Sequence, residues 1–214
     1  MKLYGAPVSP FVRKVLVYAD VKGVAIELIP TGLNDPNPDF LATSPFRKIP
    51  GFSDGDFQIS DSTAIITYIE AKHPAPPMLG ETPEEKAQVM WYDEFADTIF
   101  TPAAGPAFFQ RVVAPKFMQQ DCDHAVADNA EFVAVPPVLD YLERVIPASG
   151  FLVGGRLTLA DIAVACPFVN MGHASIKVDA AKYPKITKWV SEIHALPGFA
   201  TWIRREKTML GLDG

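Results

Sequence analysis

Cysteine is scarce in this chain. The 214 residues include only two, Cys122 and Cys166, and they form no CxxC pair. They therefore supply neither a disulfide framework nor a zinc site, and both are expected to be small buried residues of a protein kept reduced. Long apolar runs are also missing, because the longest one carries Asp161 and Pro167 and is too short to span a bilayer. With no leader-like start, we expect a cytoplasmic protein without membrane association.

Positive charge is scarce as well. Lys and Arg number 19 against 25 Asp and Glu, which gives a net charge of -6 and a pI of about 5.2. This balance disfavours a general nucleic-acid binder. We find neither an internal repeat nor a low-complexity tract. The length and apolar content predict one large domain or two small ones, each able to bury a core.

The first third of the chain has the pattern of an α/β unit. A strand is predicted over Met1–Gly5, then a helix that ends at Gly23, then a β-rich strand over Val24–Pro30. This βαβ order favours parallel pairing of the two strands. The further elements predicted here are a helical turn near Phe40, hairpin strands near Ile49–Ser53 and Phe57–Ile59, and an amphipathic helix from Asp61 to His73.

A proline-rich stretch separates this unit from the rest, in which no strand pattern stands out. We therefore predict a domain over residues 1–75, a linker over 76–83 and an all-helical domain over 84–214. Prolines should disturb two of the helical stretches, which are bent or broken at Pro102 and Pro106 and broken at Pro136–Pro137. The predicted helical stretches are 84–111, 123–146, 158–172, 183–195 and 198–207.

Ser9 stands before Pro10 at the start of the first helix, and Arg13 and Lys14 follow within about one turn. An N-cap is the ordinary role of such a serine. Neither an acid nor a histidine lies near it in sequence to act as a base. The hydroxyl could instead donate a hydrogen bond to an anion at the positive end of the helix.

Two other positions have both an ordinary and a functional interpretation. Pro50 is an ordinary trans proline at a strand start, or a cis proline that turns the N–H and C=O of Ile49 toward an extended peptide ligand. Asp61 and Ser62 precede a helix. They are an N-cap, or a helix start that holds a ligand carboxylate.

Five segments in this order resemble the cytosolic glutathione transferases: "LYGAPVSPFVRKV", "SPFRKIP", "DSTAI", "GGRLTLADIAVA" and "YPKITKWVSEIHALPGF". The resemblance covers nearly the whole chain. It implies a thioredoxin-like N-terminal domain of order βαβ-α-ββα, an all-helical C-terminal domain, a homodimer, glutathione as co-substrate and no metal. The family's activating residue is Tyr, Ser or Cys by class. Ser9, with Tyr4 before it and Arg13 after it, resembles a bacterial serine-type, theta-like member.

The resemblance also implies roles at the glutathione site. Ser9 is the catalytic residue that favours the thiolate, and the backbone of Ile49, before a cis Pro50, pairs with the cysteinyl unit. Asp61 and Ser62 match the positions that take the γ-glutamyl amino group and carboxylate, and Lys48 the position for the glycine carboxylate. Arg47 departs from the pattern, which commonly has Gly there.

Outside the glutathione site, Phe46 matches an aromatic key that enters the partner subunit in several classes, although local packing over its loop explains it equally well. A hydrophobic electrophile is expected against the helical domain. The candidate walls of its pocket are Phe100, Ala104, Phe108 and Phe109, and for at least half of these plain helix packing is the better explanation.

These residues predict a transferase that activates the glutathione thiolate for attack on an electrophile, in a detoxification role. Two alternatives stay open. One is a glutathione-dependent peroxidase or disulfide reductase, although Ser9 in place of a nucleophilic cysteine makes covalent thiol exchange unfavourable. The other is a non-catalytic binding protein that keeps the fold, for which Arg47 is the main motive.

Overall fold

The computed structural model describes residues 1–32 and 34–212. It divides into two compact units, Met1–Met78 and Leu79–Gly214, which are described separately below. The boundaries predicted at residues 75 and 84 stay a prediction.

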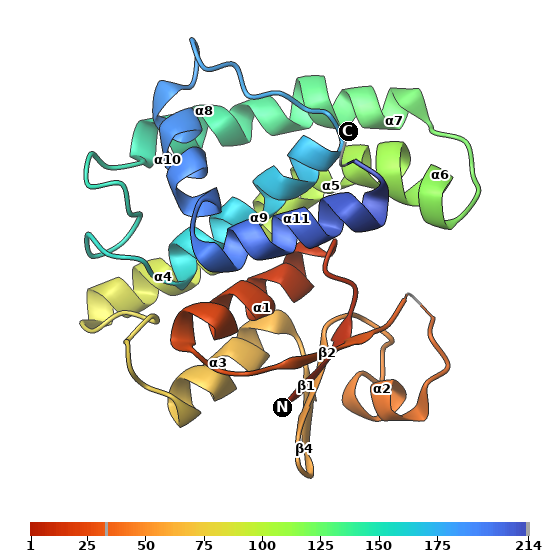
Figure 1. Cartoon of the computed structure of the whole chain (residues 1–214). Coiled ribbons are helices and arrows are strands. Elements are labelled where there is room, and N and C mark those ends of the chain that lie inside the picture. The colour runs from red at the N-terminus through yellow and green to blue at the C-terminus, as the bar shows by residue number, and fades with distance from the viewer. Residues whose placement is uncertain (33, 213–214) are drawn as a thin grey trace. The chain divides into compact units, whose positions relative to one another are not determined.

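The first unit is a four-stranded sheet with helices (Figure 1). The strand order is β2-β1-β3-β4; β1 runs parallel to β2 and antiparallel to β3, and β3 runs antiparallel to β4. The chain therefore follows the βαβ-α-ββα order predicted from the sequence. Its elements are β1 (Lys2–Gly5), α1 (Pro10–Lys22), β2 (Glu27–Pro30), α2 (Pro38–Thr43), β3 (Gly51–Asp54), β4 (Phe57–Ser60) and α3 (Ser62–Lys72).

Helix α1 forms where the sequence predicts it. Pro10 occupies its first turn, where a missing N–H costs nothing, and Gly23 ends it with a φ of 66°, a left-handed conformation that suits glycine. Val12 and Val15 on its apolar face have no exposed surface, and Leu3 of β1 is equally buried. The Val12 side chain lies against Gly5 of β1, and burial of this apolar face stabilises the helix on the sheet.

A buried polar cluster connects α1 and α3 with the segment that follows α3. The Tyr18 hydroxyl donates to Glu70 Oε2, and the Lys22 ammonium forms an ion pair with the same carboxylate. Lys22 also donates to the carbonyl of Pro76, and the Met78 N–H donates to Glu70 Oε1 at 2.9 Å. Burial and the hydrogen bond to Glu70 raise the pKa of Tyr18, so its hydroxyl stays a donor. Helices α1 and α3 thereby hold the segment that follows α3.

In the described part of the second unit, every regular element is a helix or a π-helical turn (Figure 1). Three π-helical turns, labelled η, lie within its longer stretches. Its elements are α4 (Pro83–Phe95), η1 (Ala96–Phe100), α5 (Thr101–Phe108), η2 (Phe109–Val113), α6 (Ala114–Phe117), α7 (His124–Asn129), η3 (Ala130–Ala134), α8 (Val135–Val145), α9 (Leu159–His173), α10 (Pro184–His194) and α11 (Pro197–Leu210).

The predicted break at Pro136–Pro137 is wrong, because η3 passes directly into α8 with helical backbone at Ala134 and Val135. Pro102 and Pro106 likewise do not interrupt the helical run from α4 to α6. Each π turn ends two residues before a proline: Pro102, Pro115 or Pro136. A π turn already replaces the i→i−4 hydrogen bonds that a proline would remove, so the helix continues through it.

Helix α9 is buried along nearly its whole length, and its start is held by a capping box between Thr158 and Asp161. The Asp161 carboxylate accepts hydrogen bonds from the N–H of Leu152 at 2.8 Å and from the N–H of Thr158 at 3.0 Å. Desolvation by burial outweighs these hydrogen bonds and raises the pKa of Asp161 to about 6.

Candidate functional site

The sheet register brings three of the predicted segments to one end of the first unit. Gly51, at the start of β3, pairs with Tyr4 near the end of β1 and with Ser60 at the end of β4. The residues that lead into Gly51, that follow β1 and that follow β4 therefore meet at this end. The Lys48–Pro50 segment leads into β3, the loop to Ser9 follows β1, and the Asp61–Ser62 pair follows β4.

Ser9 is the N-cap residue of α1, yet its side chain makes no cap hydrogen bond. Its backbone is fully engaged: its N–H donates to the carbonyl of Ala6 and its carbonyl accepts from Arg13, both at 3.0 Å. Within residues 1–32 and 34–212, the Ser9 hydroxyl has no hydrogen-bond partner. The side chain is half-buried and stands at the positive end of the helix dipole. A hydroxyl placed in this way can donate to an anionic ligand atom.

Two buried cations lie near the start of α1. The Lys14 ammonium donates to the hydroxyl of Thr63, in the first turn of α3, at 3.4 Å. The Arg13 guanidinium donates to the carbonyl of Val8, the residue before Ser9, at 3.5 Å. Lys14 and Arg13 are 1% and 0% exposed. Lys14 therefore lies near the start of α3, and Arg13 near the start of α1.

The Ile49–Pro50 peptide bond is cis. Pro50 is buried, and Ile49 is half-buried in front of it. In the part of the chain that the structure describes, neither the N–H nor the C=O of Ile49 has a hydrogen-bond partner. A pair of unpaired backbone groups at the start of a strand can bind an extended peptide in the manner of an added strand.

The structure supports the N-cap role considered for Asp61, while the ligand role considered for Asp61 and Ser62 stays a prediction. One Asp61 oxygen, Oδ1, accepts from the N–H groups of Thr63 and Ala64 at 2.9 and 3.0 Å, so Asp61 is the N-cap of α3. Its φ of 81° is unusual for a residue other than glycine. Ser62 is 2% exposed, and its hydroxyl has no partner among the described residues. The capping role leaves the second carboxylate oxygen and this hydroxyl available to a ligand.

The loop before Ile49 has a feature that the sequence did not reveal. Arg47 has a φ of 57°, in the left-handed region that favours glycine. The resemblance predicts Gly at this position, and the backbone gives a physical reason for that preference. Ser44 holds the loop closed: its Oγ lies 3.0 Å from the Lys48 nitrogen and 2.6 Å from the Lys48 oxygen. Lys48 itself is exposed at the surface.

The four residues predicted to line an electrophile pocket differ in exposure. Phe100 is fully buried, with its ring edge-on to Phe168 at 4.8 Å. Ala104 and Phe108 are 2% and 7% exposed, and Phe109 is 37% exposed. The structure thus gives Phe100 a place in the helical core rather than on an open pocket wall. Burial of Ala104 and Phe108 also fits helix packing, and Phe109 alone presents a sizeable apolar surface.

Phe46 is 86% exposed, at the tip of the loop that Ser44 closes. Such exposure contradicts the explanation that its ring packs locally over the loop. An aromatic side chain of this size in solvent is a surface that a partner could cover.

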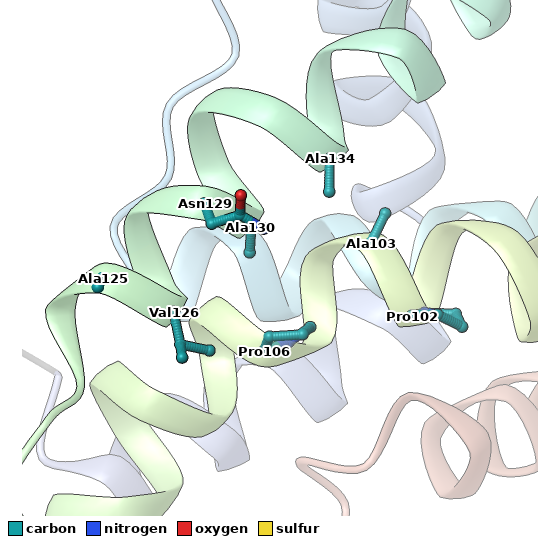
Figure 2. Close-up of a pocket in the computed structure, with 8 residues that line it drawn as sticks. All are labelled: Pro102, Ala103, Pro106, Ala125, Val126, Asn129, Ala130 and Ala134. Atoms are coloured by element: carbon teal, nitrogen blue, oxygen red, sulfur yellow. The ribbon is translucent and has the colours of Figure 1, made fainter.

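A surface pocket of about 360 Å³ lies in the helical unit, between α5 on one side and α7 and η3 on the other (Figure 2). Its walls are apolar apart from Asn129, and none of the four predicted electrophile residues is among those that line it. The residues that line it are Pro102, Ala103, Pro106, Ala125, Val126, Asn129, Ala130 and Ala134.

Over residues 1–32 and 34–212, no cluster of three or more His, Cys, Asp or Glu side chains could hold a metal ion. No helix there has both the length and the apolar character to cross a bilayer.

A thioredoxin-like sheet unit followed by an all-helical unit defines a two-domain class of proteins. Two family models match these units: "Glutathione S-transferase, N-terminal domain" over residues 3–77, and "Glutathione S-transferase, C-terminal domain" over residues 100–197. Glutathione S-transferase 3 of Zea mays is 33% identical over 205 residues, covering 93% of this chain and 91% of that protein. The chain belongs to the glutathione S-transferase family of enzymes.

Solved structures agree with this assignment. Glutathione transferase F7 from Populus trichocarpa has a TM-score of 0.82 at 27% identity, covering 100% of this chain and 99% of that one. Glutathione S-transferase I from maize, in complex with an atrazine glutathione conjugate, has a TM-score of 0.83 at 26% identity, covering 96% and 97%. The predicted thioredoxin-like and all-helical architecture is confirmed. These relatives are plant enzymes and give no support to the narrower prediction of a bacterial, theta-like member.

A relative with another name also matches. Elongation factor 1-gamma of Schizosaccharomyces pombe is 30% identical over 195 residues, which cover 90% of this chain but 46% of that protein.

Proposed function

We propose that this protein is a serine-type glutathione transferase, in which the Ser9 hydroxyl donates a hydrogen bond to the sulfur of glutathione and stabilises the thiolate. The observation that carries the proposal is that the N-cap hydroxyl of α1 makes no cap bond. A free thiol has a pKa of roughly 8.5, and each unit of depression corresponds to about 1.4 kcal/mol. One charge-assisted hydrogen bond together with a helix N-terminus supplies about 3 kcal/mol, enough for about two units.

Glutathione is proposed to bind along the end of the sheet where the three segments meet. Its cysteinyl unit pairs with the backbone of Ile49, before Pro50. Its γ-glutamyl end meets Asp61 and Ser62, where the Ser62 hydroxyl and the start of α3 suit the carboxylate and an Asp61 oxygen suits the amino group. Lys48 is proposed to reach the glycine carboxylate.

The second substrate is proposed to be a hydrophobic electrophile, which the thiolate attacks to form a thioether conjugate. A maize relative solved with an atrazine glutathione conjugate supports conjugation as the reaction class. Phe109 is the one predicted pocket residue with a sizeable exposed surface. We retain it as the contact for the electrophile, and we propose a homodimer in which Phe46 enters the partner subunit.

Two other functions remain candidates. A peroxidase or disulfide reductase would use the same thiolate. For a non-catalytic binding role, the one relevant observation is the match to a protein named as an elongation factor, over 90% of this chain and 46% of that protein.

The test is an ultraviolet difference titration of bound glutathione against pH, with wild type and Ser9→Ala. We expect the wild type to acidify the thiol, and Ser9→Ala to raise its pKa by one to two units while turnover falls at least tenfold, about 1.4 kcal/mol. Glutathione binding should persist, and so should thermal stability, because the hydroxyl caps nothing.

Thr82→Ala is the matched control. Thr82 is also an N-cap hydroxyl, but it accepts the Glu85 N–H at 3.2 Å. Its loss should therefore cost about 1 kcal/mol of stability without changing thiol acidity. Unchanged turnover in Ser9→Ala rejects the role of Ser9. Bound glutathione that stays unacidified in the wild type favours the binding role.

A further inference from the structure

Ser44 is a buried serine whose polar groups are all engaged. It follows α2 directly and is 1% exposed. Its N–H donates to the carbonyl of Phe40 at 2.8 Å, and its C=O accepts from the N–H of Arg47 at 2.9 Å. Its hydroxyl accepts from the N–H of Lys48 at 3.0 Å and donates to the C=O of Lys48 at 2.6 Å. One side chain therefore holds both backbone polar groups of Lys48.

The bond to the Lys48 carbonyl also fixes the next residue. The C=O of Lys48 and the N–H of Ile49 belong to one peptide group, which is planar, and the Lys48–Ile49 bond is trans. In a trans peptide the two groups point in opposite directions. Because the C=O is directed at the buried Ser44 hydroxyl, the Ile49 N–H is directed away from Ser44. This is the unpaired donor described above.

The same contact supports the backbone at Arg47. A left-handed φ is strained for any residue other than glycine, because the Cβ atom crowds the backbone. The loop keeps this conformation at Arg47 because Ser44 holds the residues around it: the Ser44 carbonyl accepts from the Arg47 N–H, and the Ser44 hydroxyl accepts from the Lys48 N–H. Without the hydroxyl, the Lys48–Ile49 peptide group is free to rotate.

We propose that Ser44 is a positioning residue that orients the Ile49 N–H toward the peptide portion of glutathione. The inference rests on the proposed function, since Ile49 is there assigned to the cysteinyl unit. Ser44 touches neither the thiol nor Ser9 in this account. Its loss should therefore weaken the binding of glutathione and leave the chemistry of the bound thiol unchanged.

The experiment compares Ser44→Ala with wild type by calorimetric titration with glutathione and by steady-state kinetics. We expect the Kd and KM for glutathione to rise about tenfold, because only a fraction of the loop population keeps the binding geometry. The kcat should stay within about twofold of wild type, and the pKa of the bound thiol within about 0.3 units, because the chemical step does not involve Ser44.

Thr43→Val is the matched control. Thr43 is the adjacent buried residue, and its hydroxyl donates to the Phe40 carbonyl at 2.8 Å without contacting Lys48. The substitution should leave glutathione affinity unchanged. The double variant Ser44→Ala/Arg47→Gly should regain part of the lost affinity, because glycine adopts the left-handed φ without the steric cost.

If Ser44→Ala does not fold, Ser44→Cys replaces it, since the thiol nearly keeps the shape but bonds weakly. The expected direction is the same. Wild-type affinity in the Ser44 variant overturns this inference and leaves the proposed function intact. A fall in kcat alone, with KM unchanged, also overturns it. Wild-type protein that does not bind glutathione overturns the proposed function, and this inference with it.

Discussion

The buried carboxyl group of Asp161 makes the stability of the protein depend on pH in a direction opposite to ordinary acid unfolding. Its pKa rises from 3.8 to about 6 in the folded state, mainly because burial removes the carboxylate from water. Between these two values the native protein binds a proton that the unfolded chain does not. The contribution of Asp161 is therefore fully favourable below pH 3.8 and is lost as the pH rises through about 6.

The full effect is about 3 kcal/mol, and about 2 kcal/mol of it falls between pH 7.5 and 4.5. The protonated acid fits the site, because the Thr158 hydroxyl, 3.3 Å from Asp161 Oδ2, can turn from donor to acceptor. The assay is denaturant unfolding of wild type and Asp161→Asn at several pH values. Asparagine cannot titrate, so the difference in unfolding free energy isolates Asp161 from the other carboxyl groups.

We expect the difference to move in favour of wild type by about 2 kcal/mol as the pH falls from 7.5 to 4.5. A difference that stays constant across this range would refute the reasoning. Glu85→Gln is a control in which the pH dependence of the stability difference has the opposite direction. Arg156 lowers the pKa of Glu85 from 4.5 to about 2, so its contribution is present above pH 4.5 and is lost as the pH falls toward 2.

Two further predictions concern packing and the buried polar cluster. The Phe100→Ala variant should lose about 3–5 kcal/mol of unfolding free energy, because it leaves a cavity in the helical core. The Phe109→Ala variant should lose less than about 1 kcal/mol and should instead raise the KM for an aromatic electrophile. Equal stability losses in denaturant unfolding would contradict the core assignment of Phe100. Glu70→Gln should destabilise the protein by about 3 kcal/mol, because the buried Lys22 ammonium then loses its charge partner. A loss under about 1 kcal/mol in denaturant unfolding would contradict the role of Glu70 as the partner of Lys22.

Local patterns predicted the first unit well, because its turns and helix ends carry explicit signals. Pro10 and Gly23 mark the two ends of α1, and the turn residues Gly55 and Asp56 separate β3 from β4. The sheet register then explains why segments far apart in sequence meet at Gly51. The sequence alone offers no such register, so the shared location of Ser9 and Asp61 came from the family resemblance.

Other features depend on context that a single sequence does not carry. The helix does not break at Pro136 because a π turn precedes the proline, and no simple pattern predicts such a turn. The burial of Phe100 depends on which helix faces it, since an apolar side chain on a helix is compatible with core or surface. The sequence gives no signal for the contacts of Ser44, because they form only when the loop closes on Lys48.

The uncapped start of α1 has a consequence for how such an enzyme can change over time. Pro10 and the packed face of the helix hold this end without help from the side chain at position 9. Under the proposed mechanism, a replacement there alters the acidity of the bound thiol and leaves the helix start intact. Serine, cysteine or tyrosine could therefore occupy position 9 in different relatives without a loss of folding stability, so that the chemistry changes while the fold is kept.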